Sequence, residues 1–427
     1  MCFNSASRFT LIIVLSVVFQ LGCSRFRDSS QDFPAVNELP VIKQLPDPFV
    51  KTDGTSVQSK EDWPEQREYL KSLLTHYFYG TAPTRPDVSK VKIQQLFRAP
   101  IFDETGLEEH YTLTLSHEGR EAVCRMWLVR PFSPPPYPTV VKNCFTSFHA
   151  SENSPDNEKA TAARDWEAAE MAVRRGYLLC KFQRWDFVMD KPAPSETQLG
   201  VQTLYPEHTW GAVRTWAWGQ SVVLDVLENI GYTDMDKTIA TGHSRGGQTA
   251  MAAGIYDERF QIVAPSTGGF GSCGTLRVRD PLGVRGKMDV IEAVIAKSFP
   301  HWFTDRYLEF IGKQNQMPFD GHTMLTLIAP RPFLNTNATE DQYNNPLAME
   351  AGLRTGKLVY DWMEAGDVCR IHWRPGEHAQ QEEDWKALFD FSDEIFFGKT
   401  GTSRFNQWRY PDHRPQVSWQ IPISNTH

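Results

Sequence analysis

The sequence predicts an α/β protein with a mostly parallel central sheet and helices on both faces. Short apolar runs alternate with longer helical patterns along most of the chain, and turn-forming residues separate them. The composition, 41% hydrophobic and 22% charged over 427 residues, is that of a chain that buries a large core. One large domain with insertions is therefore expected.

The elements are expected in a regular order after an initial helix over Trp63 to Phe78. Three strands with alternating apolar residues follow it, at about 91–102, 110–118 and 121–130. Further strands are expected at 137–145, 177–182, 237–242, 260–264, 332–335 and 370–374. Helices are expected at 165–176, at 210–229, after the strand at 237–242, at 346–363, and in a last segment ending near 398. The stretch at about 269–329 breaks this alternation, as a substrate wall, a cap or a surface decoration does.

The N-terminus has the pattern of an export signal over residues 1–23. Arg8 precedes an apolar run, Phe9 to Leu21, that is too short to cross a bilayer as a helix. The run ends like a bacterial lipobox, which predicts a lipid on Cys23, but Gln20 departs from that pattern and leaves simple secretion as the alternative. The protein is expected to be exported, as a periplasmic or outer-membrane-associated lipoprotein or in secreted form.

The remaining chain divides by composition. We expect a polar tether and extended arm at 24–60, a single domain at 61–400 that contains the insertion at 269–329, and a C-terminal tail at 401–427. The net charge of -8 gives no reason to expect binding to nucleic acid or to an anionic membrane surface. The cysteines after Cys23 lack metal-ligand spacing, so that no metal is expected, and one disulfide among them is compatible with export.

The chemistry centres on Ser244, which lies in a G-x-S-x-G motif between a strand-like run and a helix rich in small residues. Gly242 and Gly246 permit a sharp, strained strand-to-helix turn that exposes the serine hydroxyl, as in the α/β-hydrolase fold. The helix N-terminus, beginning at Arg245, supplies N–H groups for an oxyanion. The sequence thus predicts a three-layer α/β-hydrolase sandwich, whose insertion follows the sixth strand, with Ser244 as nucleophile.

A serine nucleophile needs a histidine base and a carboxylate, in that fold in the order Ser, acid, His. His378 lies in a polar turn directly after the last expected strand and is the preferred base, with His322 second; His243 is expected to face away from the serine. Asp341 follows the penultimate strand and is the preferred acid, with its neighbour Glu340 as the alternative.

The chain resembles the carbohydrate esterase family of the glucuronoyl esterases from its Pro-rich arm to its last helix. The matching stretches are Leu45-Pro46-Asp47-Pro48-Phe49, Arg214-Thr215-Trp216-Ala217-Trp218-Gly219, Asp257-Glu258-Arg259, Pro300-His301-Trp302-Phe303, Pro318-Phe319-Asp320-Gly321-His322 and Ala329-Pro330-Arg331-Pro332. This resemblance implies hydrolysis of esters between glucuronic acid on xylan and lignin alcohols. It also implies roles for Ser244 as nucleophile, His378 as base, Arg245 at the oxyanion and Trp302 against the sugar.

The chain departs from this family at two places. His243 and Gln248 stand where the family carries Cys and a Lys that holds hydroxyl groups of the uronate, so Gln248 is the expected substrate-binding residue. Many members also place their acid just after the strand that follows the nucleophile helix, where this chain reads Pro265-Ser266-Thr267-Gly268, without a carboxylate.

Three hypotheses follow. The first is a serine esterase of the glucuronoyl-esterase type, which acts without a cofactor, as a monomer, on a small-molecule or polysaccharide ester. The second is an esterase like the acetyl-xylan esterases or dienelactone hydrolases, and the third is a carbohydrate-binding relative without turnover.

Overall fold

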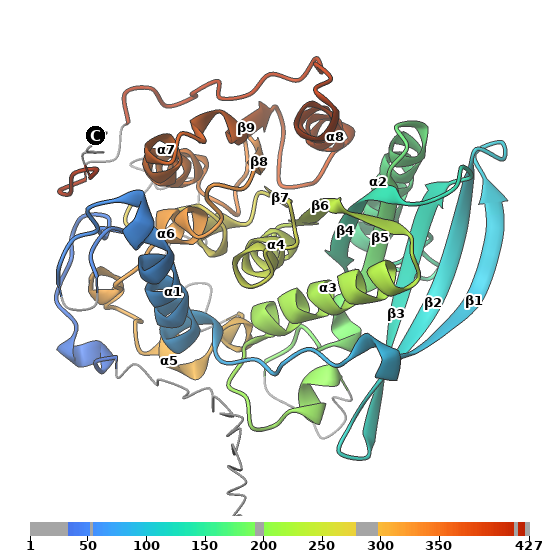
Figure 1. Cartoon of the computed structure of the whole chain (residues 1–427), viewed down its shortest axis with the longest axis horizontal. Helices are drawn as coiled ribbons and strands as arrows, with labels where there is room; N and C mark the ends of the chain where they lie inside the picture. Colours follow the sequence, from blue (N-terminus) through green and yellow to red (C-terminus); the bar gives the residue numbers. More distant parts are fainter. Residues whose placement is uncertain (1–32, 52–53, 193–199, 279–297, 414–416, 423–427) are drawn as a thin grey trace, which may run out of the picture. The chain divides into compact units, whose positions relative to one another are not determined.

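A nine-stranded sheet in the order β1-β2-β3-β5-β4-β6-β7-β8-β9 forms the centre of the computed structural model (Figure 1). The strands are β1 (Lys92–Ile101), β2 (Gly106–His117), β3 (Arg120–Pro131), β4 (Tyr137–Cys144), β5 (Leu178–Gln183), β6 (Thr233–His243), β7 (Ile262–Ser266), β8 (Phe333–Ala338) and β9 (Cys369–Arg374). The helices are α1 (Trp63–Leu74), α2 (Asp156–Arg174), α3 (Ala212–Asn229), α4 (Arg245–Tyr256), α5 (Asp305–Leu308), α6 (Gly321–Thr326), α7 (Pro346–Trp362) and α8 (Glu382–Phe397).

The structure describes residues 33–51, 54–192, 200–278, 298–413 and 417–422. The predicted signal peptide, Cys23 and the first part of the predicted tether lie outside these ranges. No helix in the described ranges is long and apolar enough to cross a membrane. The cysteines of the described chain, at positions 124, 144, 180, 273 and 369, are all buried and free, so the allowed disulfide does not form among them.

The sheet is antiparallel at one end and parallel elsewhere. β1, β2 and β3 form a meander, β3 pairs antiparallel with β5, and the remaining neighbours pair in parallel. The predicted α/β-hydrolase fold is confirmed, with one correction to the strand count. The insertion follows β7, the seventh strand of this chain and not the sixth, because three strands of the antiparallel meander and four further strands come before residue 269.

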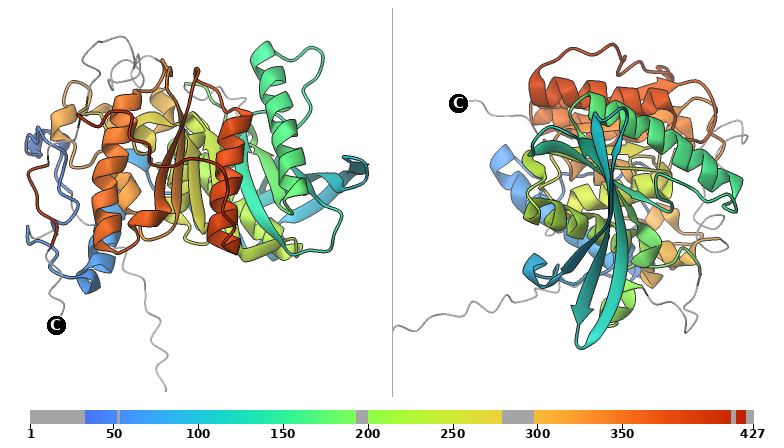
Figure 2. Two further views of the ribbon diagram at one scale, coloured as in Figure 1. Left: turned by 90° about the horizontal axis from the view of Figure 1, so that it is seen from above. Right: turned by 90° about the vertical axis from the view of Figure 1, so that its right-hand side faces the viewer.

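Two hydrophobic clusters cover the two faces of the sheet, and side chains alternate between them along each strand. On β3, for example, Met126 and Leu128 belong to one cluster, and Trp127 and Val129 to the other. The first cluster lies under α3, α4 and α7, the second under α2 and α8. Figure 2 shows the strands β8 and β9 between α7 and α8. The layers are therefore those of the predicted sandwich.

Small residues bring α4 close to the sheet. A Cβ atom at Gly254 would lie 2.3 Å from a methyl carbon of Val263 on β7, so a larger residue would push the helix outward. This close approach packs α4 directly against β7.

The arm that precedes α1 packs onto the rest of the described chain. Val36, Phe49 and Val57 are buried, and the Phe49 ring lies 5.2 Å from the ring of Trp362 on α7 and 5.8 Å from that of Trp419. The arm and the segment near the C-terminus therefore meet over α7.

The described part of the insertion divides into two portions with different surroundings. Met324 and Leu325 of α6 are buried in the same hydrophobic cluster as α7. By contrast, Phe299 and Trp302, which lie before α5, border the cavity at the carboxyl ends of the strands. The insertion thus contributes both to the core and to the cavity wall.

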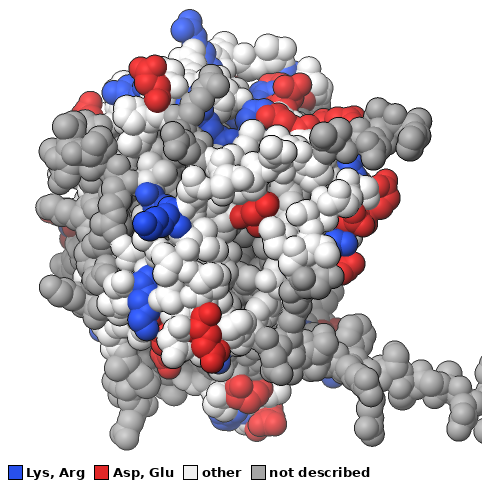
Figure 3. All heavy atoms as spheres, turned by 90° about the vertical axis from the view of Figure 1, so that its left-hand side faces the viewer, with Lys and Arg blue, Asp and Glu red and all other residues white. Residues whose placement is uncertain are grey.

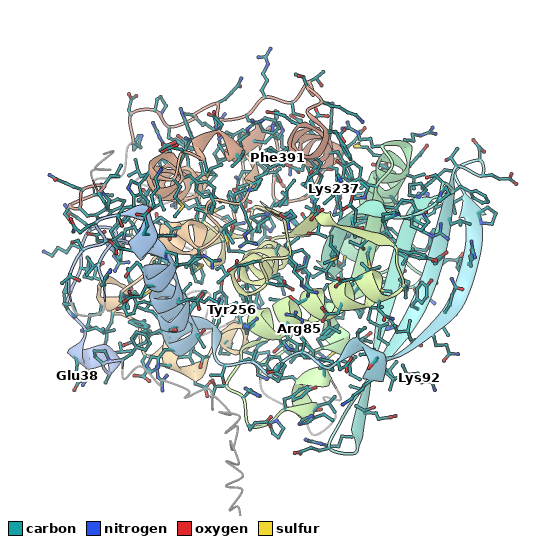
Figure 4. The ribbon with its side chains drawn as sticks, in the orientation of Figure 1. Glu38, Arg85, Lys92, Lys237, Tyr256 and Phe391 are labelled. Carbon is teal, nitrogen blue, oxygen red and sulfur yellow. The ribbon has the colours of Figure 1, made fainter. Side chains whose placement is uncertain are left out.

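Charge is mixed over the visible surface. On the face shown in Figure 3, acidic and basic side chains lie scattered among uncharged ones. A cavity of about 570 Å³ beside α3 is lined by Arg85 and Tyr256, both labelled in Figure 4, and contains none of the predicted site residues. The predicted site lies elsewhere, at the carboxyl end of β6.

Candidate active site

Ser244 forms the tip of the turn between β6 and α4. Its backbone has φ 58° and ψ -123°, a strained conformation for a residue other than glycine. The turn needs its glycines, since a Cβ at Gly242 would lie 2.3 Å from the carbonyl oxygen of Gly246, and a Cβ at Gly246 would lie 2.8 Å from Oδ1 of Asn143. The local sequence therefore folds into the predicted bend, which leaves the serine hydroxyl accessible from the adjoining cavities.

Three of the predicted side chains meet at this turn. Ser244 Oγ lies 2.9 Å from Nε2 of His378, and Nδ1 of the same ring lies 2.8 Å from Oδ2 of Asp341. With Nδ1–H donated to the carboxylate, Nε2 is left as the acceptor for the serine proton. Glu340 is exposed, and among the described residues its side chain makes no contact with the imidazole of His378. The structure thus brings Asp341, rather than Glu340, to His378.

The Asp341 carboxylate is held from several directions. Oδ1 accepts the backbone N–H groups of Tyr343 at 2.8 Å and Asn344 at 2.9 Å, and Oδ2 also accepts the hydroxyl of Thr267 at 3.2 Å. Burial alone raises the pKa of Asp341, but the hydrogen bond and charge of His378, together with these N–H groups, lower the pKa below its usual value. The carboxylate is therefore ionised and fixed toward the ring.

The loops that carry Asp341 and His378 are joined to each other. They follow the adjacent parallel strands β8 and β9, and Thr339 and Glu340 donate their N–H groups to the carbonyls of Arg374 at 2.9 Å and Gly376 at 3.0 Å. The Arg374 guanidinium also braces the His378 loop, because it donates to the carbonyls of residues 375, 377 and 379 and to Oδ2 of Asp384. From the sequence, Arg374 was assigned only to the last strand. No local motif indicates that its side chain holds the loop of His378.

Arg245, the first residue of α4, lies beside the serine. Its guanidinium carbon lies 5.0 Å from the ring centre of Trp302 and 4.9 Å from that of Phe299, and Nη1 donates to Asp190. Trp302 stacks on Phe299 with 4.0 Å between ring centres and is only 2% exposed, so a small part of its indole borders the cavity. Asp190 was not predicted, because it lies in a loop without a motif and its partners are distant in sequence.

Two cavities adjoin the hydroxyl of Ser244. One, of about 590 Å³, is lined by the predicted residues Ser244, Arg245, Gln248, Trp302 and His378. The other, of about 350 Å³, shares the serine, Arg245 and His378 and is lined on its far side by residues of α2 and by Phe145 and Trp185. An ester centred on the hydroxyl therefore has space for a group on either side of its carbonyl.

Gln248 combines burial with an unused acceptor. The side chain is 5% exposed, and its Oε1 has no hydrogen-bond partner among the described residues. A buried acceptor of this kind costs free energy unless a ligand or water donates to it. Since Gln248 borders the larger cavity, it is available for a hydroxyl group there.

Two expectations about other histidines are resolved by the structure. His243 does not face away from the site: its ring centre lies 4.7 Å from that of His378, because the strained turn at Ser244 brings consecutive side chains to the same edge of the sheet. Burial and the charge of His378 lower the pKa of His243 far below its usual value. His322, the second choice of base, is buried, and its Nε2 lies 2.8 Å from the carbonyl oxygen of Pro46. Its side chain therefore holds the arm before α1 and does not contact Ser244 in the described structure.

The described residues show no group of three or more His, Cys, Asp or Glu side chains arranged to hold a metal ion. The polar groups gathered at Ser244 are a hydroxyl, an imidazole, a carboxylate and a guanidinium, which is the set that acyl transfer through a serine needs.

Comparison with known proteins decides the family. A family model described as glucuronyl esterase of fungi matches residues 140–364, which is more than half of the chain. The chain belongs to the glucuronyl esterase family. This membership makes it a carboxylic ester hydrolase. It also favours the prediction of a glucuronoyl-esterase type over the acetyl-esterase and binding-protein alternatives.

Individual glucuronyl esterases and related proteins match over most of the chain. A carbohydrate esterase named MZ0003, from an unknown prokaryote, is 29% identical over 409 residues, 83% of this chain and 90% of that protein. The 4-O-methyl-glucuronoyl methylesterase of Podospora anserina is 27% identical over 301 residues, 68% of this chain and 54% of that protein.

Solved structures of glucuronoyl esterases share the fold. The carbohydrate esterase family 15 glucuronoyl esterase from Caldicellulosiruptor kristjansonii is 28% identical and superposes with a TM-score of 0.68, covering 90% of this chain and 97% of that one. The enzyme from Solibacter usitatus superposes with a TM-score of 0.72 at 24% identity, covering 84% and 99%. The second likeness shows the fold alone.

Proposed function

We propose that this glucuronyl esterase hydrolyses esters of glucuronic acid, such as those that join xylan to lignin alcohols, through an acyl-enzyme on Ser244. The observation that carries the proposal is the continuous hydrogen-bonded chain from Ser244 Oγ through His378 to Asp341, at 2.9 Å and 2.8 Å. Its position at a strained strand-to-helix turn, at the junction of two cavities, supports a catalytic use of that chain.

The reaction proceeds in two halves. His378 Nε2 takes the proton of Ser244 while Oγ bonds to the ester carbonyl carbon, and the N–H groups at the start of α4, with the Arg245 guanidinium, stabilise the oxyanion. As the tetrahedral intermediate collapses, the C–O bond to the alcohol breaks and the alcohol leaves with the proton from the imidazolium. Water, deprotonated by His378, then attacks the acyl-enzyme and releases the acid and the free serine. Asp341 remains ionised throughout and orients the ring.

The larger cavity supports binding of the sugar acid. Gln248 offers its unpartnered Oε1 to a hydroxyl group, and the indole edge of Trp302 borders the same space. The names of the matched relatives support a glucuronoyl acid part, since several are 4-O-methyl-glucuronoyl methylesterases. We assign substrate binding to Gln248 and Trp302, and oxyanion stabilisation to Arg245.

Two substrate assays test the proposal. The enzyme is expected to release acid from a methyl ester of glucuronic acid, and the Ser244→Ala variant is expected to lose this activity. Acetate release from acetylated xylan is measured in parallel with the same two proteins. Acetate release by the wild type without hydrolysis of the glucuronate ester would contradict the proposed substrate class.

We also propose that the enzyme acts as an exported monomer, anchored by a lipid on Cys23. Export agrees with membership of an esterase family whose substrates are plant polymers. A Cys23→Ala variant should then leave the membrane fraction, and size-exclusion chromatography should give the mass of one chain. An unchanged membrane fraction would contradict the anchor.

A further inference from the structure

A buried carboxylate, Asp190, contacts Arg245 and Trp302 of the site, although neither the triad nor the family resemblance assigns it a role. It follows β5 and a short turn of 3-10 helix at Arg184–Asp186, and its side chain is 4% exposed. Burying a carboxylate to this extent costs free energy of folding unless hydrogen-bond donors surround it. The groups that donate to Asp190 therefore show which residues it holds in place.

Donors from two distant segments meet on Asp190. Arg245 Nη1, at the start of α4, donates to Oδ2. From the insertion, Trp302 Nε1 donates to Oδ1 at 2.9 Å and His301 Nε2 to the same oxygen at 3.0 Å. One carboxylate therefore joins the residue next to the nucleophile to two residues of the insertion, of which Trp302 borders the larger cavity.

The charges around Asp190 do not cancel. Arg184 lies 3.9 Å from Oδ2, is 5% exposed and has an Nε atom without a partner among the described residues. Burial alone raises the pKa of Asp190, but the hydrogen bond of His301 and the charges of Arg245 and Arg184 lower the pKa well below its usual value. Two guanidinium groups thus share one ionised carboxylate. Both arginines border the smaller cavity at Ser244, where the remaining positive charge favours an oxyanion.

An arginine side chain needs such an anchor to act at a fixed point. Its long stem has many rotamers, and an interaction that strengthens in the transition state requires the donor to be in place beforehand. The Arg245 side chain is 31% exposed, and Asp190 is the acidic partner that the described structure gives it. Without that partner the guanidinium is free to turn into either of the two cavities.

We infer that Asp190 is a positioning residue of this esterase, which holds the Arg245 guanidinium beside Ser244 and fixes the Trp302 indole to the same point. The inference rests on the proposed function, because it assumes that Arg245 stabilises the oxyanion. Asp190 acts through these two residues and makes no contact with the reacting atoms.

A double-mutant cycle on the full-length enzyme tests this role. We expect Asp190→Asn to lower kcat on the methyl glucuronate ester about 10- to 100-fold, because a displaced donor loses most of its effect. Arg245→Met alone should lower kcat at least as much. In the Arg245→Met background, adding Asp190→Asn should change kcat by less than about twofold, because coupled residues are not additive. Additive losses would overturn the inference.

Asp257→Asn is the matched control. Asp257 is also buried and pairs with Arg259 at 2.8 Å, but it lies at the opposite end of α4 from Ser244. This variant should lower the Tm and leave kcat unchanged, which separates loss of a buried ion pair from loss of positioning. If Asp190→Asn does not fold, Asp190→Glu is measured in both backgrounds, with the same expected coupling to Arg245.

Two results would distinguish this inference from the proposed function. If Asp190→Asn retains wild-type kcat while Ser244→Ala and Arg245→Met are impaired, Asp190 has no positioning role and the proposed function stands. If Ser244→Ala retains activity, the proposed function itself fails.

Discussion

The loops after β7 and β8 lie side by side at the same edge of the sheet, but only one of them supplies a carboxylate. Ser266 and Thr336 pair between these two parallel strands, and both loops reach the region of His378. The β8 loop carries Asp341. The β7 loop contains Thr267, Gly268 and Gly269, with φ values of 52°, 117° and 58°, and its described residues 267–278 include no Asp or Glu.

The β7 loop supports the carboxylate of its neighbour. The Thr267 hydroxyl lies 3.2 Å from Asp341 Oδ2 and accepts the Asn344 amide at 2.6 Å. Gly269 leaves room for Asn344, since a Cβ there would lie 2.5 Å from its Oδ1. Neighbouring strands are about 4.8 Å apart, so an acid on either one can reach the same imidazole. We therefore expect that the acid can stand on either loop, provided that the other loop adapts.

The largest expected effect comes from removing the β8 carboxylate. Asp341→Asn should lower kcat by about 10²- to 10⁴-fold, because the amide neither fixes the Nδ1–H tautomer nor stabilises the imidazolium. Glu340→Gln, which changes the adjacent exposed acid, should remain within about twofold of the wild type. Steady-state kinetics on the methyl glucuronate ester measure both. A larger loss in the Glu340 variant would reverse the assignment.

A smaller effect is expected from moving the acid to the β7 loop. Adding Thr267→Asp to Asp341→Asn should restore about tenfold of the lost kcat, because Thr267 already lies within hydrogen-bond distance of the carboxylate and Asp tolerates its positive φ. Thr267→Asn added to Asp341→Asn introduces a side chain of the same shape as Asp but without its charge, and it should restore none of the lost kcat. Equal rates for the two double variants would show that the two loops are not exchangeable.

The smallest effect concerns stability and the residue before the nucleophile. The pKa of His243 is far below its ordinary 6.5 in the folded protein, mainly through burial and the nearby charge of His378. Near pH 6.5 the His243 side chain therefore binds a proton in the unfolded chain but stays neutral in the folded protein. The stability that His243 contributes is fully present above that pH and is lost as the pH falls below it, by about 1 kcal/mol between pH 6.5 and 5.5.

His243→Cys, the residue of the related esterases, should remove this part of the acid sensitivity. Urea unfolding at pH 7.5, 6.5 and 5.5 measures the free energy of unfolding of both proteins, and contributions of the other histidines cancel in the difference. The same decline with pH in both proteins would show that His243 titrates normally in the fold.

The sequence allowed prediction of those site residues that have local signals. Ser244 lies in a glycine-flanked turn, and Asp341 and His378 directly follow strands, so the order of elements was enough to find them. Asp190 has no such signal, because its partners Arg245 and Trp302 lie 55 and 112 residues away and meet it only in the folded chain. The orientation of His243 was predicted wrongly since strand alternation does not extend across a residue with φ 58°.

The account depends on covalent catalysis by one hydroxyl, which an activity-based label tests directly. A fluorophosphonate probe is incubated with the wild type, Ser244→Ala and His378→Ala, and the modified peptide is identified by mass spectrometry. We predict that the label is attached to Ser244 in the wild type, is absent from Ser244→Ala and forms much more slowly in His378→Ala. Active enzyme that hydrolyses ester while Ser244 stays unlabelled would contradict the account.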